Sequence, residues 1–229
     1  MLWLVVPAGV ARAAEPRQPL LVIGADGLRW SDVDPDRTPA LAALLREGAI
    51  GDVAVRSVRT ATCPIDGWLT ISAGRRAADA ASPDAPNPGN PPCRPVPPAP
   101  GNGPVPGWAG YLAAARAESY GATPGLLGDA LDRAGICAVA QGPGAAIAIA
   151  RSDGTMPGPS PQADPATAIG FPRCPLDVVD AGAVRDAADA PAGAREATAG
   201  DRATQVAAVD KAVGAALATA PASARVLVV

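Results

Sequence analysis

Two patterns of apolar and polar residues alternate along this chain, one typical of buried strands and one of amphipathic helices. Residues 20–25 (LLVIGA) form a continuous apolar run, as expected of a strand that is buried on both faces. Thr38 and Pro39 then open a helical pattern that Gly48 closes, because Thr is a common N-cap, Pro favours the first helical position and Gly ends helices. By the same reasoning the sequence predicts further strands at 52–58, 136–140, 176–179 and 225–229, and further helices at 62–73, 123–135 and 201–219.

This alternation of strands and helices predicts an α/β fold, a three-layer sandwich with a mainly parallel sheet between layers of helices. We expect residues 16–229 to form one domain of this kind, since 229 residues can bury a substantial core. Residues 79–107 are rich in Pro and Gly and lack an apolar period, so they are interpreted as a surface insertion. The run at 225–229 would leave an open hydrophobic edge, which predicts a fold that is incomplete at the C-terminus.

Residues 1–15 have the composition of an export segment. An apolar stretch from Leu2 to Val10 precedes Ala11-Arg12-Ala13, which resembles a signal-peptide cleavage pattern without the basic n-region, or the remnant of a membrane anchor. The sequence therefore predicts an extracytoplasmic protein, secreted or associated with the cell envelope or membrane through this segment or through a missing C-terminal region. Four cysteines in an exported chain predict one or two disulfides, with three possible pairings.

Composition excludes several classes of function. The chain contains no histidine, which rules out a Ser-His-Asp triad, a Cys-His dyad and His-ligated metal built from this chain alone. A formal net charge of −3, with only 3% aromatic residues, makes nucleic acid an unexpected partner.

Two segments carry the candidate chemistry. Asp26 follows the first predicted strand, and ligands of open α/β sheets bind at the carboxyl ends of strands. Thr62, in Thr62-Cys63-Pro64, precedes a predicted helix, where backbone N–H groups and the helix dipole favour an anion. Thr60 lies in the same stretch, but Thr62 has the Thr-x-Pro spacing. Together the two segments predict a site for a metal and a phosphate.

This pattern, with residues 38–44 (TPALAAL) between the two segments and 68–74 (WLTISAG) after them, resembles the amino-terminal part of the alkaline phosphatase superfamily. The closest resemblance is to its phosphodiesterase and nucleotide pyrophosphatase branch. The resemblance implies that Asp26 binds a divalent, zinc-type metal and that Thr62 is the nucleophile, in contact with the same metal. It also places Asp180, at the end of the strand predicted at 176–179, near a further metal-ligand position.

The sequence departs from this family in ways that affect activity. Residues 181–184 (AGAV) supply no second ligand after Asp180, and one Asp and one Thr hold a divalent ion poorly. The expected function is therefore an exported, metal-dependent phosphoric-ester hydrolase or phosphotransferase-like domain for small phosphoesters, inactive as this fragment. Whether the chain is an enzyme stays open at this point.

Two other functions remain as alternatives. The first is a non-catalytic cell-envelope protein that keeps the fold, in which Asp26 and Asp180 are turn or helix-capping carboxylates. The second and weaker is a dinucleotide-binding domain, because residues 142–147 (GPGAAI) follow a predicted strand and imitate half of a dinucleotide fingerprint.

Overall fold

The computed structural model describes residues 18–51, 57–59, 62–80, 93–99, 103–157, 174–185 and 201–229. Within these ranges, a four-stranded sheet has the order β2-β3-β1-β4, and every pair of neighbouring strands is parallel. The strands are β1 (Leu20–Asp26), β2 (Ala138–Gln141), β3 (Leu176–Ala183) and β4 (Arg225–Val228). This arrangement confirms the α/β fold with a parallel sheet that the sequence predicts.

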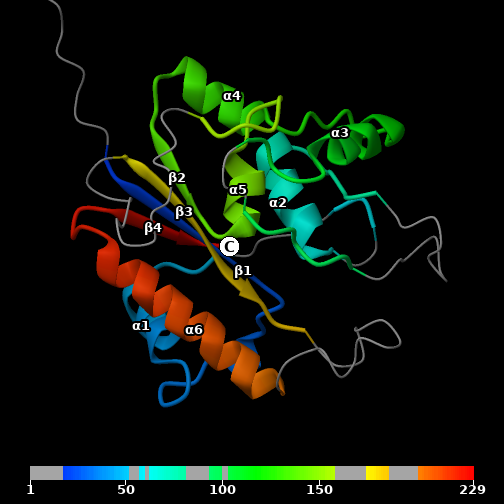
Figure 1. The fold of residues 1–229 in the computed structure, drawn as a ribbon. Helices are drawn as coiled ribbons and strands as arrows, with labels where there is room; N and C mark the ends of the chain where they lie inside the picture. The colour runs from blue at the N-terminus through cyan, green and yellow to red at the C-terminus, as the bar shows by residue number, and fades with distance from the viewer. Residues whose placement is uncertain are drawn as a thin grey trace, which may run out of the picture.

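Helices cover both faces of the sheet (Figure 1). One layer contains α2 (Pro64–Ala73), α3 (Trp108–Ala117), α4 (Leu126–Arg133) and α5 (Pro143–Ile149). The other contains α1 (Pro39–Glu47) and α6 (Arg202–Thr219), and a short 3-10 helix, η1 (Trp30–Asp32), lies between β1 and α1. The three layers are those of the predicted sandwich.

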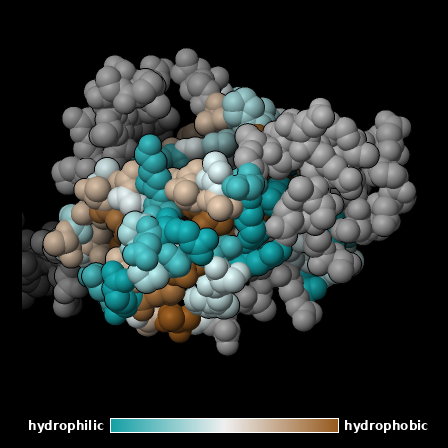
Figure 2. Space-filling model, turned by 90° about the horizontal axis from the view of Figure 1, so that it is seen from below, coloured by the Kyte–Doolittle hydropathy of each residue, from teal (hydrophilic) through white to brown (hydrophobic). Residues whose placement is uncertain are grey.

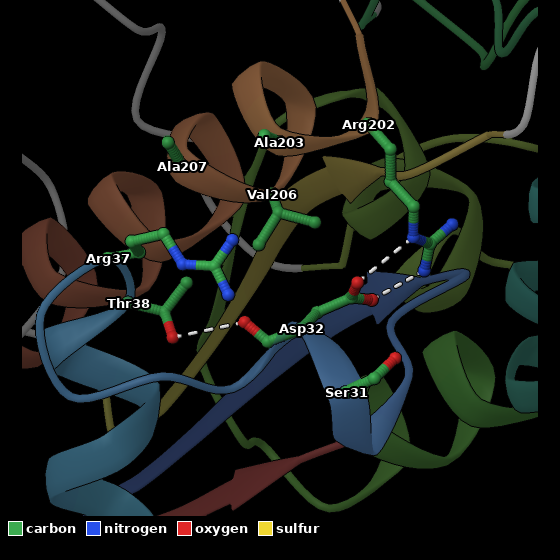
Figure 3. A pocket seen from close by; sticks show the side chains of 8 residues that line it. All are labelled: Ser31, Asp32, Arg37, Thr38, Arg202, Ala203, Val206 and Ala207. Carbon is green, nitrogen blue, oxygen red and sulfur yellow. Dashed lines mark hydrogen bonds and ion pairs between the residues drawn. The ribbon is translucent and has the colours of Figure 1, made fainter.

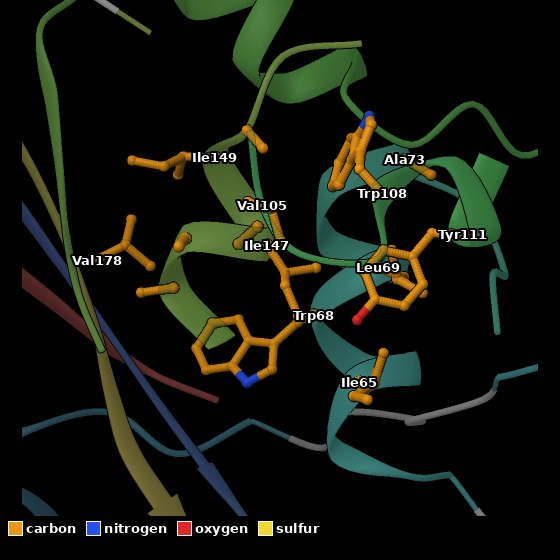
Figure 4. Close-up of a cluster of buried hydrophobic side chains, with 14 of the residues drawn as sticks. Ile65, Trp68, Leu69, Ala73, Val105, Trp108, Tyr111, Ile147, Ile149 and Val178 are labelled. Carbon is orange, nitrogen blue, oxygen red and sulfur yellow. The ribbon is translucent and has the colours of Figure 1, made fainter. Parts of the chain in front are cut away.

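Each helical layer packs on its own hydrophobic cluster. On the α2 side, Trp68, Leu69 and the apolar residues of α5 pack against Val178 of β3 (Figure 4). On the α6 side, Leu21 and Ile23 of β1 are fully buried. Alternate residues of β1 therefore pack into the hydrophobic clusters on opposite faces of the sheet. This explains why residues 20–25 form a continuous apolar run.

The first turn of α1 is stabilised by a contact that the sequence did not predict. Thr38 is the N-cap residue, but its side chain makes no capping hydrogen bond. Instead, the backbone N–H groups of Leu41 and Ala40 donate to the carboxylate of Asp210 in α6, at 2.8 and 3.3 Å. A buried acid from a helix 170 residues away thus satisfies the first turn of α1.

Element boundaries agree with the sequence in many places, but several differ, and α3 and α5 were not predicted as helices. β3 continues three residues beyond Asp180, to Ala183. Helix α4 begins at Leu126, after a Gly125 N-cap, and not at the Thr-Pro pair 123–124. Of the strand predicted at 52–58, residues 52–56 lie outside the described residues, and 57–58 are not in a strand.

All four cysteines form disulfides, Cys63–Cys93 and Cys137–Cys174, in agreement with the one or two disulfides that the sequence predicts. The first ties the Pro-rich stretch 79–107 to the start of α2. This stretch reaches the core, because Val105 is buried in the α2-side cluster. The segment predicted to direct export, 1–15, lies outside the described residues. In the parts that are described, no helix is both long and apolar enough to cross a membrane.

Candidate phosphoryl site at the carboxyl end of the sheet

Asp26 and Asp180 lie on neighbouring strands at the carboxyl end of the sheet. Asp26 ends β1, and Asp180 pairs in register with Gly24, two residues before it. Burial raises the pKa of the Asp26 carboxyl, and the negative charge of Asp180 raises it further; Arg185 and the N–H of Gly27 act in the opposite direction. The structure therefore brings together the two carboxylates that the sequence singled out, close enough for their charges to interact.

The chain segments that follow β1 and β3 are held against each other. The N–H of Val184 donates to the carbonyl of Asp26 at 2.8 Å. Gly27 has φ +74°, and a Cβ at this position would collide with the Val184 carbonyl oxygen, so only glycine allows this approach. The arrangement places Arg185, the next residue, with its Nη2 3.6 Å from Oδ2 of Asp26.

Asp180 is engaged by backbone N–H groups. Its Oδ2 accepts from Gly144 at 2.8 Å, in the first turn of α5, and its Oδ1 accepts from Gly182 at 3.0 Å. The carboxylate therefore holds the start of a helix, as the turn or capping alternative expects. Gly144 has a packing role as well, because a Cβ there would collide with the indole of Trp68. These contacts account for the GPG sequence at 142–144 without a dinucleotide.

Thr62 lies two residues before α2, in a half-buried position. The N-cap of α2 is Cys63, and Pro64 occupies the first helical position. Because Cys63 is joined to Cys93, the backbone next to Thr62 is tied covalently to a second segment of the chain.

A buried acid fixes the first turn of α2. Asp66 is fully buried, and its carboxylate accepts from the N–H of Asp79 at 2.8 Å and from that of Cys63 at 3.3 Å. Arg59 lies 3.4 Å from the same carboxylate and also donates to the carbonyl of Asp79. Burial raises the pKa of Asp66, and these donors oppose the rise. The sequence carries a local signal for this role, because an acidic residue at the third helical position is a common capping signal.

Asp79, which donates to Asp66, also contacts a residue further along the Pro-rich stretch 79–107. The guanidinium of Arg94 forms a two-pronged ion pair with the carboxylate of Asp79. Because Arg94 follows Cys93 directly, the segment at 93–94 is joined to the start of α2 by the disulfide and to Asp79, whose N–H donates to Asp66, by the ion pair.

Helix α2 is placed on the sheet by Trp68. A Cβ on Gly24 of β1 would collide with the indole, so the ring lies directly on the strand two residues before Asp26. Figure 4 shows Ile65, in the first turn of α2, at the end toward which β3 runs, and Ala73 at the opposite end. The start of α2 and the two carboxylates thus belong to the same end of the sheet. Within the described residues, no hydrogen bond or ion pair joins Thr62 to Asp26 or Asp180.

The described side chains do not by themselves form a centre for the divalent metal that the resemblance implies. Asp180 already accepts two backbone N–H groups, and Asp26 has a guanidinium beside it. Among the residues that the structure describes, His, Cys, Asp and Glu nowhere gather in threes that could hold a metal ion. Zinc sites usually have three or four protein ligands and calcium sites six to eight oxygens. Asp26, Thr62 and Asp180 as a ligand set remain a prediction.

A separate hollow of about 240 Å³ lies between η1 and the start of α6 (Figure 3). Asp32 and Arg202 face each other there in a two-pronged ion pair, with contacts of 2.9 and 2.5 Å. Hydrogen bonding to Arg202 lowers the pKa of Asp32. Arg202 also donates to the carbonyl of Gly27, next to Asp26, so this ion pair braces the loop that leaves β1.

Figure 2 shows the face of the molecule that is seen from below relative to Figure 1. On the described part of this face, hydrophilic residues lie beside smaller hydrophobic patches.

Comparison with known proteins adds evidence on the amino-terminal part of the chain. A search of curated proteins found no match. The family model for type I phosphodiesterase / nucleotide pyrophosphatase matches residues 20–79, a range that contains β1, α1, α2 and both Asp26 and Thr62. That match confirms the resemblance predicted from the strand-terminal aspartate and the Thr-x-Pro segment: residues 20–79 carry the pattern of a phosphodiesterase and pyrophosphatase family of the alkaline phosphatase superfamily.

Proposed function

We propose that the chain is an exported phosphoric-ester hydrolase-like or phosphotransferase-like domain in which Thr62 meets the phosphoryl group. Asp26 and Asp180 are the carboxylates that face a cation at the same end of the sheet. We expect the 229-residue chain to have little or no hydrolytic activity. The single observation that carries the proposal is the family match over residues 20–79, which spans both chemical segments.

The start of α2 is suited to a phosphoryl group. The first N–H groups of a helix have no partner within the helix and carry part of its positive dipole, so they favour an anion. Asp66, Arg59 and the Cys63–Cys93 bond fix this turn before any ligand arrives. Groups that are fixed in advance stabilise developing negative charge without reorganising.

Thr62 needs activation to attack phosphorus. A threonine hydroxyl is a poor nucleophile at neutral pH and requires a base or a metal to favour its alkoxide. The chain has no histidine to act as that base. The matched family is generally metal-dependent, and a divalent ion supplies such activation and offsets charge on the phosphoryl oxygens. Asp26 and Asp180 are the residues that would face the ion. With so few donors we expect weak metal binding and therefore low activity.

The test compares the 229-residue chain with two threonine variants. Hydrolysis of bis(p-nitrophenyl) phosphate and p-nitrophenyl phosphate is measured with and without Mn²⁺ and Zn²⁺ for the wild type, Thr62→Ala and Thr60→Ala. Loss of a nucleophile lowers turnover by roughly 10³-fold or more, so Thr62→Ala should remove any activity that Thr60→Ala retains. Where turnover is below detection, inorganic phosphate titrated into isotope-labelled protein should shift the amide resonances of the first turn of α2, and less so in Thr62→Ala. Equal behaviour of Thr62→Ala and the wild type in both assays contradicts the proposal.

A second candidate function is a non-catalytic envelope protein that keeps the phosphoesterase fold. The observation in its favour is Asp180, whose two oxygens both accept backbone N–H groups and so serve the structure of α5. In that case neither substrate turns over, phosphate shifts no resonance of α2, and Thr62→Ala changes nothing in either assay.

A further inference from the structure

Among the described residues, Arg185 is the one cationic side chain that lies against Asp26, and the sequence alone assigns it no role. It follows β3 by two residues, and its Nη2 lies 3.6 Å from Oδ2 of Asp26. A guanidinium keeps its positive charge at every physiological pH. We propose that Arg185 is the resident cation of Asp26 and that it keeps divalent metal ions away from the carboxyl ends of β1 and β3. The inference rests on the proposed function in one respect, that Asp26 is the carboxylate facing a cation.

The backbone of Arg185 is fixed independently of its side chain. Its N–H donates to Oε1 of Gln205 at 2.8 Å, and Nε2 of Gln205 donates back to the Arg185 carbonyl at 3.1 Å. On the other side, Val184 donates to the carbonyl of Asp26. The hydrogen bonds of Val184 and Arg185 therefore fix the backbone that holds the guanidinium beside Asp26. A cation tethered in this way acts at a high effective concentration, with which a dissolved metal ion must compete.

Asp180, the other carboxylate at this end of the sheet, contributes little to the binding of a metal ion. Asp180 is occupied by the N–H groups of Gly144 and Gly182, so a metal displacing Arg185 would gain mainly one carboxylate. It would also approach a fixed positive charge. Without the guanidinium, however, Asp26 and Asp180 would remain as neighbouring negative charges with no side-chain cation paired to Asp26. Oxygen sites with few protein ligands bind divalent ions weakly.

The experiment measures Mn²⁺ binding to the 229-residue chain by calorimetry and by the loss of the free-ion electron paramagnetic resonance signal. Arg185→Gln should bind one Mn²⁺ at least tenfold more tightly than the wild type, and Asp26→Asn in the same chain should remove that gain. Arg185→Lys keeps the charge and should exclude Mn²⁺ as the wild type does. The matched control is Arg37→Gln, which removes an exposed guanidinium that lies 3.6 Å from Asp34, and it should not gain Mn²⁺ binding.

Two outcomes overturn the inference: no gain in Mn²⁺ affinity of Arg185→Gln over the wild type, or an equal gain in Arg185→Lys. Thermal unfolding of each variant checks the fold, and Arg185→Ala replaces Arg185→Gln, with the same expected gain in Mn²⁺ affinity, if the glutamine variant unfolds. The readout is Mn²⁺ binding in the absence of any phosphoester, so it does not depend on turnover. Failure of the proposed phosphoryl chemistry is thereby separated from failure of this inference.

Discussion

The indole ring of Trp68 fills the space that a side chain on Gly24 would occupy. Helix α2 and strand β1 meet at this point, two residues before Asp26, and the ring also covers Gly144 at the start of α5. A single side chain thus sets the distance between the helix that follows Thr62 and the strand that ends at Asp26. The site depends on a packing contact as much as on its polar groups.

Substitution of Gly24 by Ala should therefore destabilise the protein. The added Cβ collides with the Trp68 ring, and overpacking of a core typically costs about 1–3 kcal/mol. The free energy of unfolding from urea titration measures this loss. Combining Gly24→Ala with Trp68→Leu should cost less than the sum of the two single variants, because the two positions are in contact.

Gly67→Ala in α2 is the matched control for this substitution. No atom lies within 4 Å of a Cβ at Gly67, and Ala is favoured over Gly inside a helix by about 1 kcal/mol. Gly67→Ala should leave stability unchanged or raise it. Equal destabilisation by both substitutions would count against the packing argument.

The buried carboxyl group of Asp177 should make the free energy of unfolding depend on pH in an unusual way. It is fully buried in β3, its Oδ2 accepts from Gln141 at 2.6 Å, and its Oδ1 has no partner among the residues that the structure describes. Burial raises the pKa of Asp177 to about 6, and the Gln141 hydrogen bond opposes this rise. Because the folded state prefers the protonated acid, this contribution to stability is fully present below the ordinary pKa of 3.8 and is lost as pH rises through about 6.

Asp177→Asn should therefore raise the free energy of unfolding at pH 7 by about 1–2 kcal/mol. It should also flatten the change in stability between pH 4 and pH 7. The control is Asp36→Asn at an exposed position, which should leave the shape of the pH profile unchanged. Urea titrations at several pH values measure both variants, and a profile that is unaltered by Asp177→Asn would contradict the assignment.

The sequence predicted the parts of this fold that depend on local chemistry. The apolar run at 20–25 and the Thr38-Pro39 and Thr62-x-Pro64 starts gave β1, α1 and α2 within one or two residues, because periodicity and capping are local properties. The pairs that shape the site are not local. The partner of Asp32 is Arg202, 170 residues away, and that of Asp26 is Arg185, and neither pair follows a spacing rule. Asp180 had the expected position, but its bonds to Gly144 and Gly182 depend on how β3 lies beside α5.

Asp210 provides a test of such a distant contact. Its carboxylate accepts from the N–H groups of Leu41 and Ala40 at the start of α1. Asp210→Ala leaves these donors without a partner in a buried place, which costs about 1–3 kcal/mol. Hydrogen exchange of the Leu41 amide should accelerate together with the loss of stability. Asp201→Ala removes the exposed cap of α6 and should cost less stability, without affecting Leu41.

The two disulfides allow the global and local effects of a cross-link to be separated. Cys63–Cys93 and Cys137–Cys174 close loops of similar length, with sequence separations of 30 and 37, so chain entropy predicts a loss of roughly 3–4 kcal/mol on removing either one. Only the first bond includes the N-cap of α2, next to Thr62. Paired Cys→Ala variants should therefore have similar unfolding free energies, whereas the first turn of α2 should lose hydrogen-exchange protection only in the Cys63→Ala/Cys93→Ala protein. If that turn stays equally protected in both variants, Asp66 and Arg59 hold it without the covalent bond, and the disulfide is a global cross-link alone.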